Sequence, residues 1–172
     1  MKKILFVFSI SFLLFSCSDS NDLVEISNDD LVGKWNLIEL TSNVTNKFSY
    51  QGNTVKSTTS IYGKNYNFSM TFSDNPNEYS TEGSLTIVTE TNTNGEVETQ
   101  EIESGSIMDL ESGEWEIKGN KLITKNNDVS SEIIIDSYTE NKLVLKQKIN
   151  ETQTVQGVGV EIVGNATVIL ER

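Results

Sequence analysis

The sequence of 172 residues contains no histidine, one cysteine and one proline. Without histidine, a serine or cysteine nucleophile lacks its usual imidazole base, and no imidazole can bind a metal ion. A single cysteine cannot form a disulfide within the chain or a thiolate zinc site. Basic residues are also few, with 13 against 25 acidic residues and a formal net charge of −12. This balance argues against nucleic acid as a partner, because phosphate contacts need Lys and Arg.

The N-terminus has the layout of a secretory signal peptide. Two lysines precede an apolar run over residues 4–15, which is too short to cross a bilayer but suits a signal peptide. The run leads into the sequence LFSC, which ends at Cys17 and resembles the lipobox of bacterial lipoproteins. The resemblance implies a lipoprotein signal peptide over residues 1–16, cleavage before the cysteine and a lipid on the Cys17 thiol. An ordinary signal peptide followed by a buried cysteine is the alternative.

A polar segment follows the apolar run. Residues 17–30 are rich in Asp, Asn and Ser, a composition typical of a flexible tether. The sequence SDSND directly after Cys17 resembles the export signal of surface lipoproteins in Bacteroidetes-type bacteria. We therefore expect a protein of the cell envelope that is anchored at the outer membrane by the lipid on Cys17. Exposure on the cell surface is the finer expectation.

From residue 31 onward, apolar and polar residues alternate with the period of half-buried β-strands. Turn signals, such as the Asn-Gly pair at Asn94, separate the alternating runs at hairpin intervals. No run has the spacing of an amphipathic helix, so helices should be short or absent. The pattern predicts about eight to ten strands, at residues 33–41, 54–62, 65–73, 78–91, 96–108, 113–118, 121–126, 130–138, 142–152 and 156–171.

A closed barrel is the architecture that these hairpins favour. Closing an antiparallel meander buries its apolar face and removes both sheet edges. The mature length suits about eight strands around one interior. We predict an all-β, antiparallel up-and-down β-barrel of about eight to ten strands over residues 31–172, after the signal peptide and the short acidic tether. A two-sheet sandwich would show similar alternation and is the alternative.

Two segments resemble lipocalin-like proteins. Residues 31–37 read LVGKWNL, and Gly33 and Trp35 match the Gly-x-Trp motif on the first strand of lipocalin barrels. Residues 112–123 resemble a hairpin of small lipocalin-like lipoproteins. In lipocalins a basic residue from a late strand often stacks over this tryptophan, which implies that role for Arg172, the single arginine. The resemblance thus assigns barrel closure to Gly33, Trp35 and Arg172.

An eight-stranded barrel is either just filled by side chains or able to hold one small ligand. The candidate ligand contacts are bulky side chains expected on the interior face: Tyr66, Phe68, Met70, Phe72 and Trp115. Our leading hypothesis is a lipid-anchored, lipocalin-like barrel that binds or carries a small apolar or amphipathic molecule. If these side chains instead only fill the core, the alternative is an interaction or assembly module. Its acidic outer face would then act on a protein, a glycan or a divalent cation.

The acidic residues are concentrated in one region. Between residues 65 and 117 there are twelve acidic residues and no Lys or Arg. They should line the outer face of neighbouring strands, where like charges need screening, cations or another offset. Glu90-x-Asn92-x-Asn94-Gly95-x5-Glu101 nearly matches a calcium loop, although a hairpin with an Asn-Gly turn explains the same residues. Weak Ca²⁺ binding is therefore the alternative to a plain hairpin here.

Catalytic signals are absent from the sequence. No glycine-rich phosphate loop joins a strand to a helix, and carboxylate pairs carry little information in so acidic a chain. We therefore predict that the protein is not an enzyme and uses no cofactor. We also expect it to be a monomer.

Overall fold

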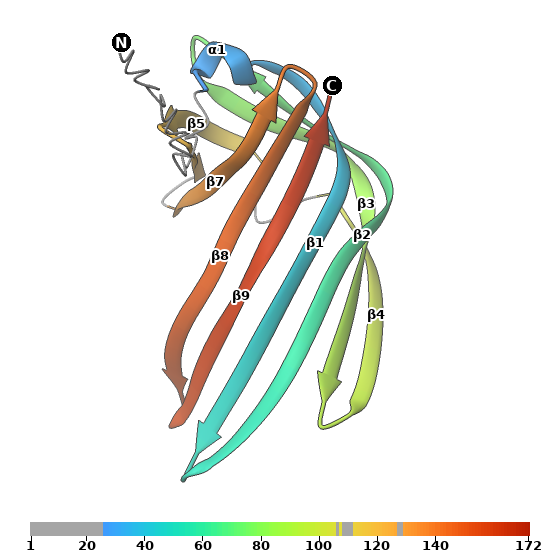
Figure 1. The fold of residues 1–172 in the computed structure, drawn as a ribbon, viewed down its shortest axis with the longest axis vertical. Coiled ribbons are helices and arrows are strands. Elements are labelled where there is room, and N and C mark those ends of the chain that lie inside the picture. Colours follow the sequence, from blue (N-terminus) through green and yellow to red (C-terminus); the bar gives the residue numbers. More distant parts are fainter. Residues whose placement is uncertain (1–25, 106, 108–111, 127–128) are drawn as a thin grey trace, which may run out of the picture.

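The computed structural model describes residues 26–105, 107, 112–126 and 129–172. In these residues almost every segment is a strand, as Figure 1 shows. The elements are α1 (Asn28–Leu31), β1 (Gly33–Tyr50), β2 (Asn53–Ser73), β3 (Glu78–Thr93), β4 (Glu96–Ser104), β5 (Ser112–Lys118), β6 (Lys121–Asn126), β7 (Val129–Thr139), β8 (Lys142–Val155) and β9 (Val158–Glu171). The predicted all-β fold is confirmed.

Eight of these strands close into an antiparallel barrel. The ring runs β2-β1-β9-β8-β7-β6-β5-β3, and pairing of β2 with β3 closes it. Strand β4 pairs with β3 outside the ring. The predicted barrel is confirmed, with one difference from a simple meander. The first residues of β3 pair with β5, whereas its later residues pair with β4. The β3–β4 hairpin therefore leaves the ring.

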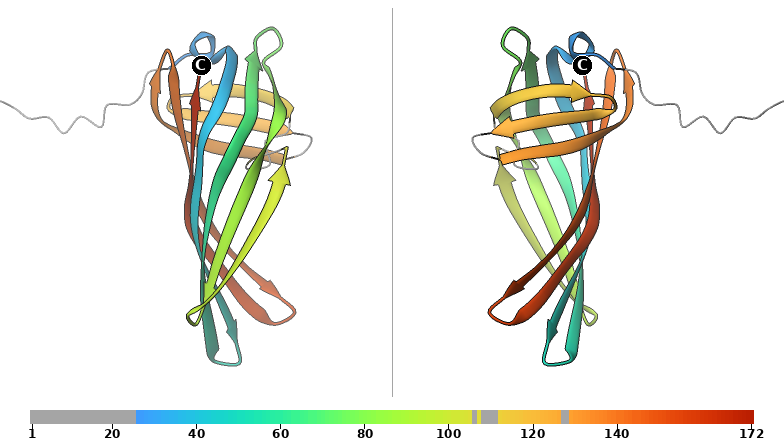
Figure 2. Two further views of the ribbon diagram at one scale, coloured as in Figure 1. Left: turned by 90° about the vertical axis from the view of Figure 1, so that its right-hand side faces the viewer. Right: turned by 90° about the vertical axis from the view of Figure 1, so that its left-hand side faces the viewer.

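The strands differ greatly in length, and this difference divides the molecule into two regions. The short strands β5, β6 and β7 cross one end only (Figure 2). Beyond them, β4-β3-β2-β1-β9-β8 continue as an open sheet. We call the closed part the barrel and the open part the extension, which comprises residues 43–64, 86–104 and 147–165.

The extension begins where the sequence predicted a break. Separate strands at 54–62 and 65–73 were predicted, and this is wrong because β2 continues through both. The positive φ of Asn65 (54°) belongs to a bulge, at which the pairing with β3 shifts. The Tyr66 hydroxyl donates to the Gly63 carbonyl at 2.8 Å and accepts from the Leu40 amide at 3.1 Å. A Cβ at Gly63 would lie 2.6 Å from the Tyr66 ring, so only glycine at this position leaves room for the ring.

The barrel is filled by apolar side chains from every strand of the ring and from the residue that ends α1. The fully buried large side chains include Trp35, Phe72, Leu31, Met70, Leu85, Leu122, Ile133, Ile135, Leu143 and Leu145. Ile26 packs against the same core. Residues 26–30, assigned to the tether from sequence, therefore contact the barrel in this structure.

The predicted signal peptide, Cys17 and most of the predicted tether lie outside the described residues. In the part of the chain that is described, no helix has the length and apolar character needed to cross a membrane.

Candidate functional site

One end of the barrel is closed by a cluster around Trp35. The Arg172 guanidinium carbon lies 4.1 Å from the centroid of the Trp35 ring, a cation–π contact. Arg172 Nη2 donates to the carbonyls of Asp30 at 2.9 Å and Val32 at 2.7 Å. The indole Nε1 of Trp35 donates to the Leu31 carbonyl at 2.8 Å. Trp35 and Arg172 thus tie the first strand, the last strand and α1 together.

Gly33 lies beside this cluster in a conformation that favours glycine, with φ at 128°. A Cβ there would meet the Arg172 guanidinium at 3.6 Å, an ordinary contact, so the backbone angle and not space accounts for the glycine. The structure therefore brings together the three residues to which the resemblance assigned closure.

Two titratable groups in the closing cluster have shifted pKa values. Hydrogen bonds from the backbone N–H and the hydroxyl of Ser27 hold the pKa of the Asp30 carboxyl below its usual value. Burial, and then the charge of Asp30, raise the pKa of the Tyr138 phenol. The Tyr138 hydroxyl donates to the backbone carbonyl of Asp30 at 3.0 Å and so holds α1 on the barrel, whereas the Asp30 carboxyl caps the N-terminus of α1 through Ser27.

The predicted ligand contacts form part of the packed barrel core. Phe68, Met70, Phe72 and Trp115 are at most 4% exposed, and Tyr66 is partly buried. The Phe72 and Trp115 rings meet edge-on with centroids 5.4 Å apart. Trp115 Nε1 donates to the carbonyls of Ser73 and Glu78, which fixes the β2–β3 turn on β5. The structure thus brings these side chains together as core, and ligand contact by them stays a prediction.

The extension carries a groove that the sequence analysis did not identify. It has a volume of about 690 Å³ and is open to solvent. The lining residues lie on one face of the neighbouring strands β1, β9 and β8 and on the β8–β9 turn: Asn46, Phe48, Tyr50, Gln153, Val155, Gln156, Val158, Val160 and Ile162. Phe48 is 41% exposed and Tyr50 51% exposed. Large apolar side chains therefore remain accessible here, unlike those of the barrel.

Strand pairing places the groove on the continuation of the barrel's inward face. Along β1, the buried Leu40 and Ser42 are followed at every second position by Val44, Asn46 and Phe48. Opposite Phe48 lies Val160 of β9, which in turn faces Gln153 of β8. The side chains that would point into a closed barrel thus line an open surface.

Two tight turns join the strands that carry this surface. The tight β1–β2 turn uses Gln51 and Gly52, both with positive φ, so Tyr50 pairs directly with Asn53. A second such turn at Gln156 and Gly157 joins β8 to β9. The alternation of Val158, Val160 and Ile162 signalled one wall, but the polar stretch around Phe48 concealed the other.

Comparison with known proteins identifies the family. A sequence model described as a lipocalin-like domain matches residues 31–145, about two thirds of the chain. The chain belongs to this lipocalin-like family. None of the curated proteins or solved structures searched matches it. The lipocalin-like barrel is in general a small-molecule-binding fold, and its members are typically not enzymes.

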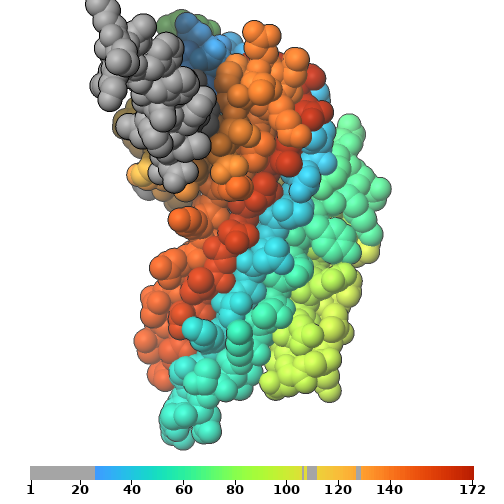
Figure 3. Space-filling model, in the orientation of Figure 1, coloured from blue at the N-terminus to red at the C-terminus, as the bar shows by residue number. Residues whose placement is uncertain are grey.

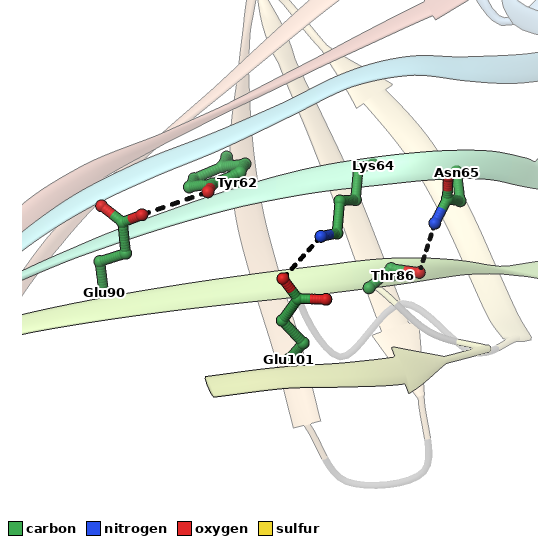
Figure 4. A network of polar contacts seen from close by, with 6 residues as sticks. All are labelled: Tyr62, Lys64, Asn65, Thr86, Glu90 and Glu101. Atoms are coloured by element: carbon green, nitrogen blue, oxygen red, sulfur yellow. Dashed lines mark hydrogen bonds and ion pairs between the residues drawn. The ribbon is translucent and has the colours of Figure 1, made fainter. Parts of the chain in front are cut away.

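The outer face of this lipocalin-like domain carries a network of polar contacts, shown in Figure 4. The Tyr62 hydroxyl donates to Glu90 at 3.2 Å, Lys64 pairs with Glu101 at 2.6 Å, and Asn65 donates to Thr86 at 3.1 Å. Burial, and then the hydrogen bond to Glu90, raise the pKa of Tyr62. Lysines from β1 and β2 therefore offset part of the negative charge of β3 and β4, as Lys34 also does for Glu82.

The near match to a calcium loop forms a hairpin. Asn94 and Gly95 have φ of 53° and 91°, and Thr93 pairs with Glu96 across them. Such angles are those of a type I′ turn. Glu90 and Glu101 bind Tyr62 and Lys64 (Figure 4). Among the described residues, no group of three or more acidic or cysteine side chains is arranged to hold a metal ion.

The acidic residues do not all lie on the outer face, as the sequence analysis expected. Glu78, Glu82, Glu90, Glu101 and Glu103 lie on the face opposite the core-facing residues of β3 or their β4 partners. Glu96 and Glu98, however, pair with Thr93 and Thr91, which share the inward face of β3. The expectation is wrong for these two, because β4 extends past the closed ring and exposes both of its faces.

Proposed function

We propose that this lipocalin-like domain binds a small apolar or amphipathic molecule in the groove of the extension. The observation that carries the proposal is the groove of about 690 Å³, whose exposed apolar lining comes from β1, β8 and β9. Single exposed apolar residues are common, whereas a contiguous concave set is typical of a binding surface. A filled barrel beside an open groove also explains why large apolar side chains occur in both regions.

Binding would be driven by burial of apolar area. Each 100 Å² of apolar surface removed from water contributes about 2.5 kcal/mol before the costs of association. Because the groove is open on one side, it buries only part of a ligand. We therefore expect reversible binding, as a carrier requires, and an elongated chain suits the groove better than a compact molecule does.

We further propose that the protein is a lipoprotein of the cell envelope, anchored at the outer membrane through Cys17. The lipobox-like sequence LFSC supports the anchor, and the acidic residues after it support surface exposure. The described chain starts at the end of the molecule that carries α1, whereas the β1–β2 and β8–β9 tips lie at the other end (Figure 1). An anchor before α1 would thus leave the groove free to exchange ligand.

A second candidate function rests on the packing of the barrel core. A filled barrel could serve as an interaction or assembly module whose acidic outer face contacts a protein, a glycan or a divalent cation. Outward Glu78, Glu82, Glu90 and Glu103 support this reading. This alternative predicts salt-sensitive binding that does not depend on the groove residues, including any weak binding of Ca²⁺ near Glu90.

Native mass spectrometry of the protein purified gently from its own envelope tests the first proposal. We expect a retained small-molecule mass that disappears in the double variant Phe48→Ser/Val160→Ser. The matched control is Val163→Ser, because Val163 is 42% exposed but lies on the opposite face of β9. Both side chains of the double variant line the groove, and Phe48 is well exposed, so the fold should persist.

Two outcomes would overturn the groove proposal. If the double variant retains the ligand mass and a folded Met70→Ala variant loses it, the binding site lies in the barrel interior. A bare protein that also fails to bind added decyl maltoside would favour the interaction module. Pull-downs at low and high salt, and titration with Ca²⁺, would then test that module directly.

A further inference from the structure

The inward face of the extension is negatively charged and lacks positive charge. Within its described ranges, 43–64, 86–104 and 147–165, the residues paired on this face include Glu96, Glu98 and Glu151. One row across the sheet shows the arrangement, and it reads Glu96, Thr93, Ser57, Asn46, Ile162 and Glu151. An acidic side chain thus lies at each end of a row that crosses the groove wall.

The lysines of the same region lie on the opposite face. Lys47 is one position from the groove residues Asn46 and Phe48, so its side chain points to the other side of β1. There it pairs with Glu161 at 2.9 Å. Lys56 pairs with Lys47, Lys64 pairs with the outward Thr86, and Lys148 is next to the inward-facing Ile149, so these three side chains also point to the outer face. The extension therefore separates its charges by face.

Glu151 is the acidic residue best placed to meet a ligand in the groove. It lies opposite Ile162 and two positions from Gln153, and both of these line the groove. Two positions along one face of a strand correspond to about 7 Å. A chain lying against Phe48 and Val160 could therefore extend its polar end to the Glu151 carboxylate.

We propose that the groove prefers amphiphiles with a positively charged polar end over those with an anionic one. This inference rests on the proposed function, since it names the class of ligand that the same groove takes. The apolar wall binds the chain, the carboxylate of Glu151 attracts an ammonium or guanidinium group, and an anionic head meets repulsion from the same carboxylate. A second copy of the chain is a poorer occupant, because it would bring two strongly acidic proteins together face to face.

The experiment compares three decyl amphiphiles that differ in the charge of the head group. Decyltrimethylammonium, decyl maltoside and decyl sulfate are titrated into the full-length protein by calorimetry, at low salt and below their micelle-forming concentrations. Residues 4–15 are apolar and could take up amphiphile themselves. Binding in the groove is therefore the part that the Phe48→Ser/Val160→Ser variant loses.

Glu151→Gln and Glu161→Gln form the matched pair of charge variants. Both remove one negative charge, and the two residues lie on adjacent strands but on opposite faces. We expect the preference for the cation over decyl maltoside to fall about fivefold in Glu151→Gln, the effect of one unit charge at about 4 Å in water. In Glu161→Gln the preference should stay within about twofold, because charges exposed on the outer face are screened by water and salt.

Failure of the charge preference can be distinguished from failure of groove binding itself. Groove binding of decyl maltoside with no preference among the three head groups would overturn the inference and leave the proposed function intact. An equal loss of preference in both charge variants would also overturn it, because net charge alone would then be responsible. If no amphiphile depends on Phe48 and Val160, both proposals fail.

Discussion

The barrel and the extension share the long strands β1, β2, β3, β8 and β9, but the inward face of these strands is buried in the barrel and exposed in the extension. In the barrel, the inward side of β1 carries Trp35 and Leu37, which are at most 2% exposed. In the extension, that side continues as Asn46, Phe48 and Tyr50, and the last two are largely exposed. Short crossing strands make the difference, because β5, β6 and β7 cover only one end of the long strands. Strand length thus creates the candidate binding surface, and a bulge between Leu37 and Glu39 shifts the alternation of β1 by one residue on the way.

The composition of the extension suits a sheet that is exposed to water. Threonine is frequent in it, and a β-branched residue stabilises a strand without needing full burial. Thr59 and Thr91 share a hydrogen bond of 3.3 Å across β2 and β3. The edge strand β4 carries Glu96, Glu98, Glu101 and Glu103. Charges of this kind discourage pairing with another chain at an open edge.

The two regions also differ in shape. In the space-filling view, the barrel end forms a broad body and the extension a tapering sheet below it (Figure 3). The long strands run through both without interruption. Substitutions that act on one region and spare the other therefore test whether the division is real.

Substitutions of large inward side chains should show the largest contrast. Trp35→Ala should lower the free energy of unfolding by about 3–5 kcal/mol, since it removes a fully buried aromatic side chain. Phe48→Ala, on the same strand, should lower it by less than about 1 kcal/mol, because that side chain is 41% exposed. Urea unfolding of both variants measures the two values. Similar losses would mean that the extension is packed as tightly as the barrel.

Closure of the barrel should be separable from binding in the groove. Arg172→Gln removes the cation over Trp35 and weakens hydrogen bonds to α1, and should cost about 1–2 kcal/mol of unfolding free energy. Arg172→Lys keeps the charge but not the planar fork, so its loss should be smaller. Affinity for decyl maltoside should not change in either variant. A parallel loss of affinity would show that the ends of the molecule are coupled.

Much of the barrel could be predicted from sequence because its signals are local. Alternation at every second residue indicates a strand with two different faces, and Gly33 with Trp35 indicates where the first strand begins. The Asn94-Gly95 turn is equally local, since positive φ at both positions needs residues of this kind. These patterns sufficed for the all-β barrel and for the β3–β4 hairpin.

The extension and its groove could not be predicted, because they depend on which strands end early. A bulge at Asn65 and a turn at Gly63 have the same sequence signature, and only pairing with β3 distinguishes them. Likewise, alternation shows that Phe48 and Phe72 each face one side of a sheet, but not whether another strand covers that side. Coverage depends on contacts between distant segments, and those are not encoded in any short stretch.

The smallest expected effect concerns the N-terminal cap of α1. The carboxyl of Asp30 accepts hydrogen bonds from the Ser27 N–H at 2.8 Å and from its hydroxyl at 2.7 Å, and these lower its pKa from 3.8. A lowered folded-state pKa adds stability above the unfolded value, and that stability is lost as the pH falls through the folded value. Asp30→Ala should therefore be less stable than the unsubstituted protein at pH 7, and the difference should shrink below about pH 3.8. Asp29→Ala removes the same charge from the same turn and serves as the control, and urea unfolding at several pH values measures both. A difference between Asp30→Ala and the unsubstituted protein that persists unchanged at low pH would show that the carboxylate charge contributes nothing to the cap of α1.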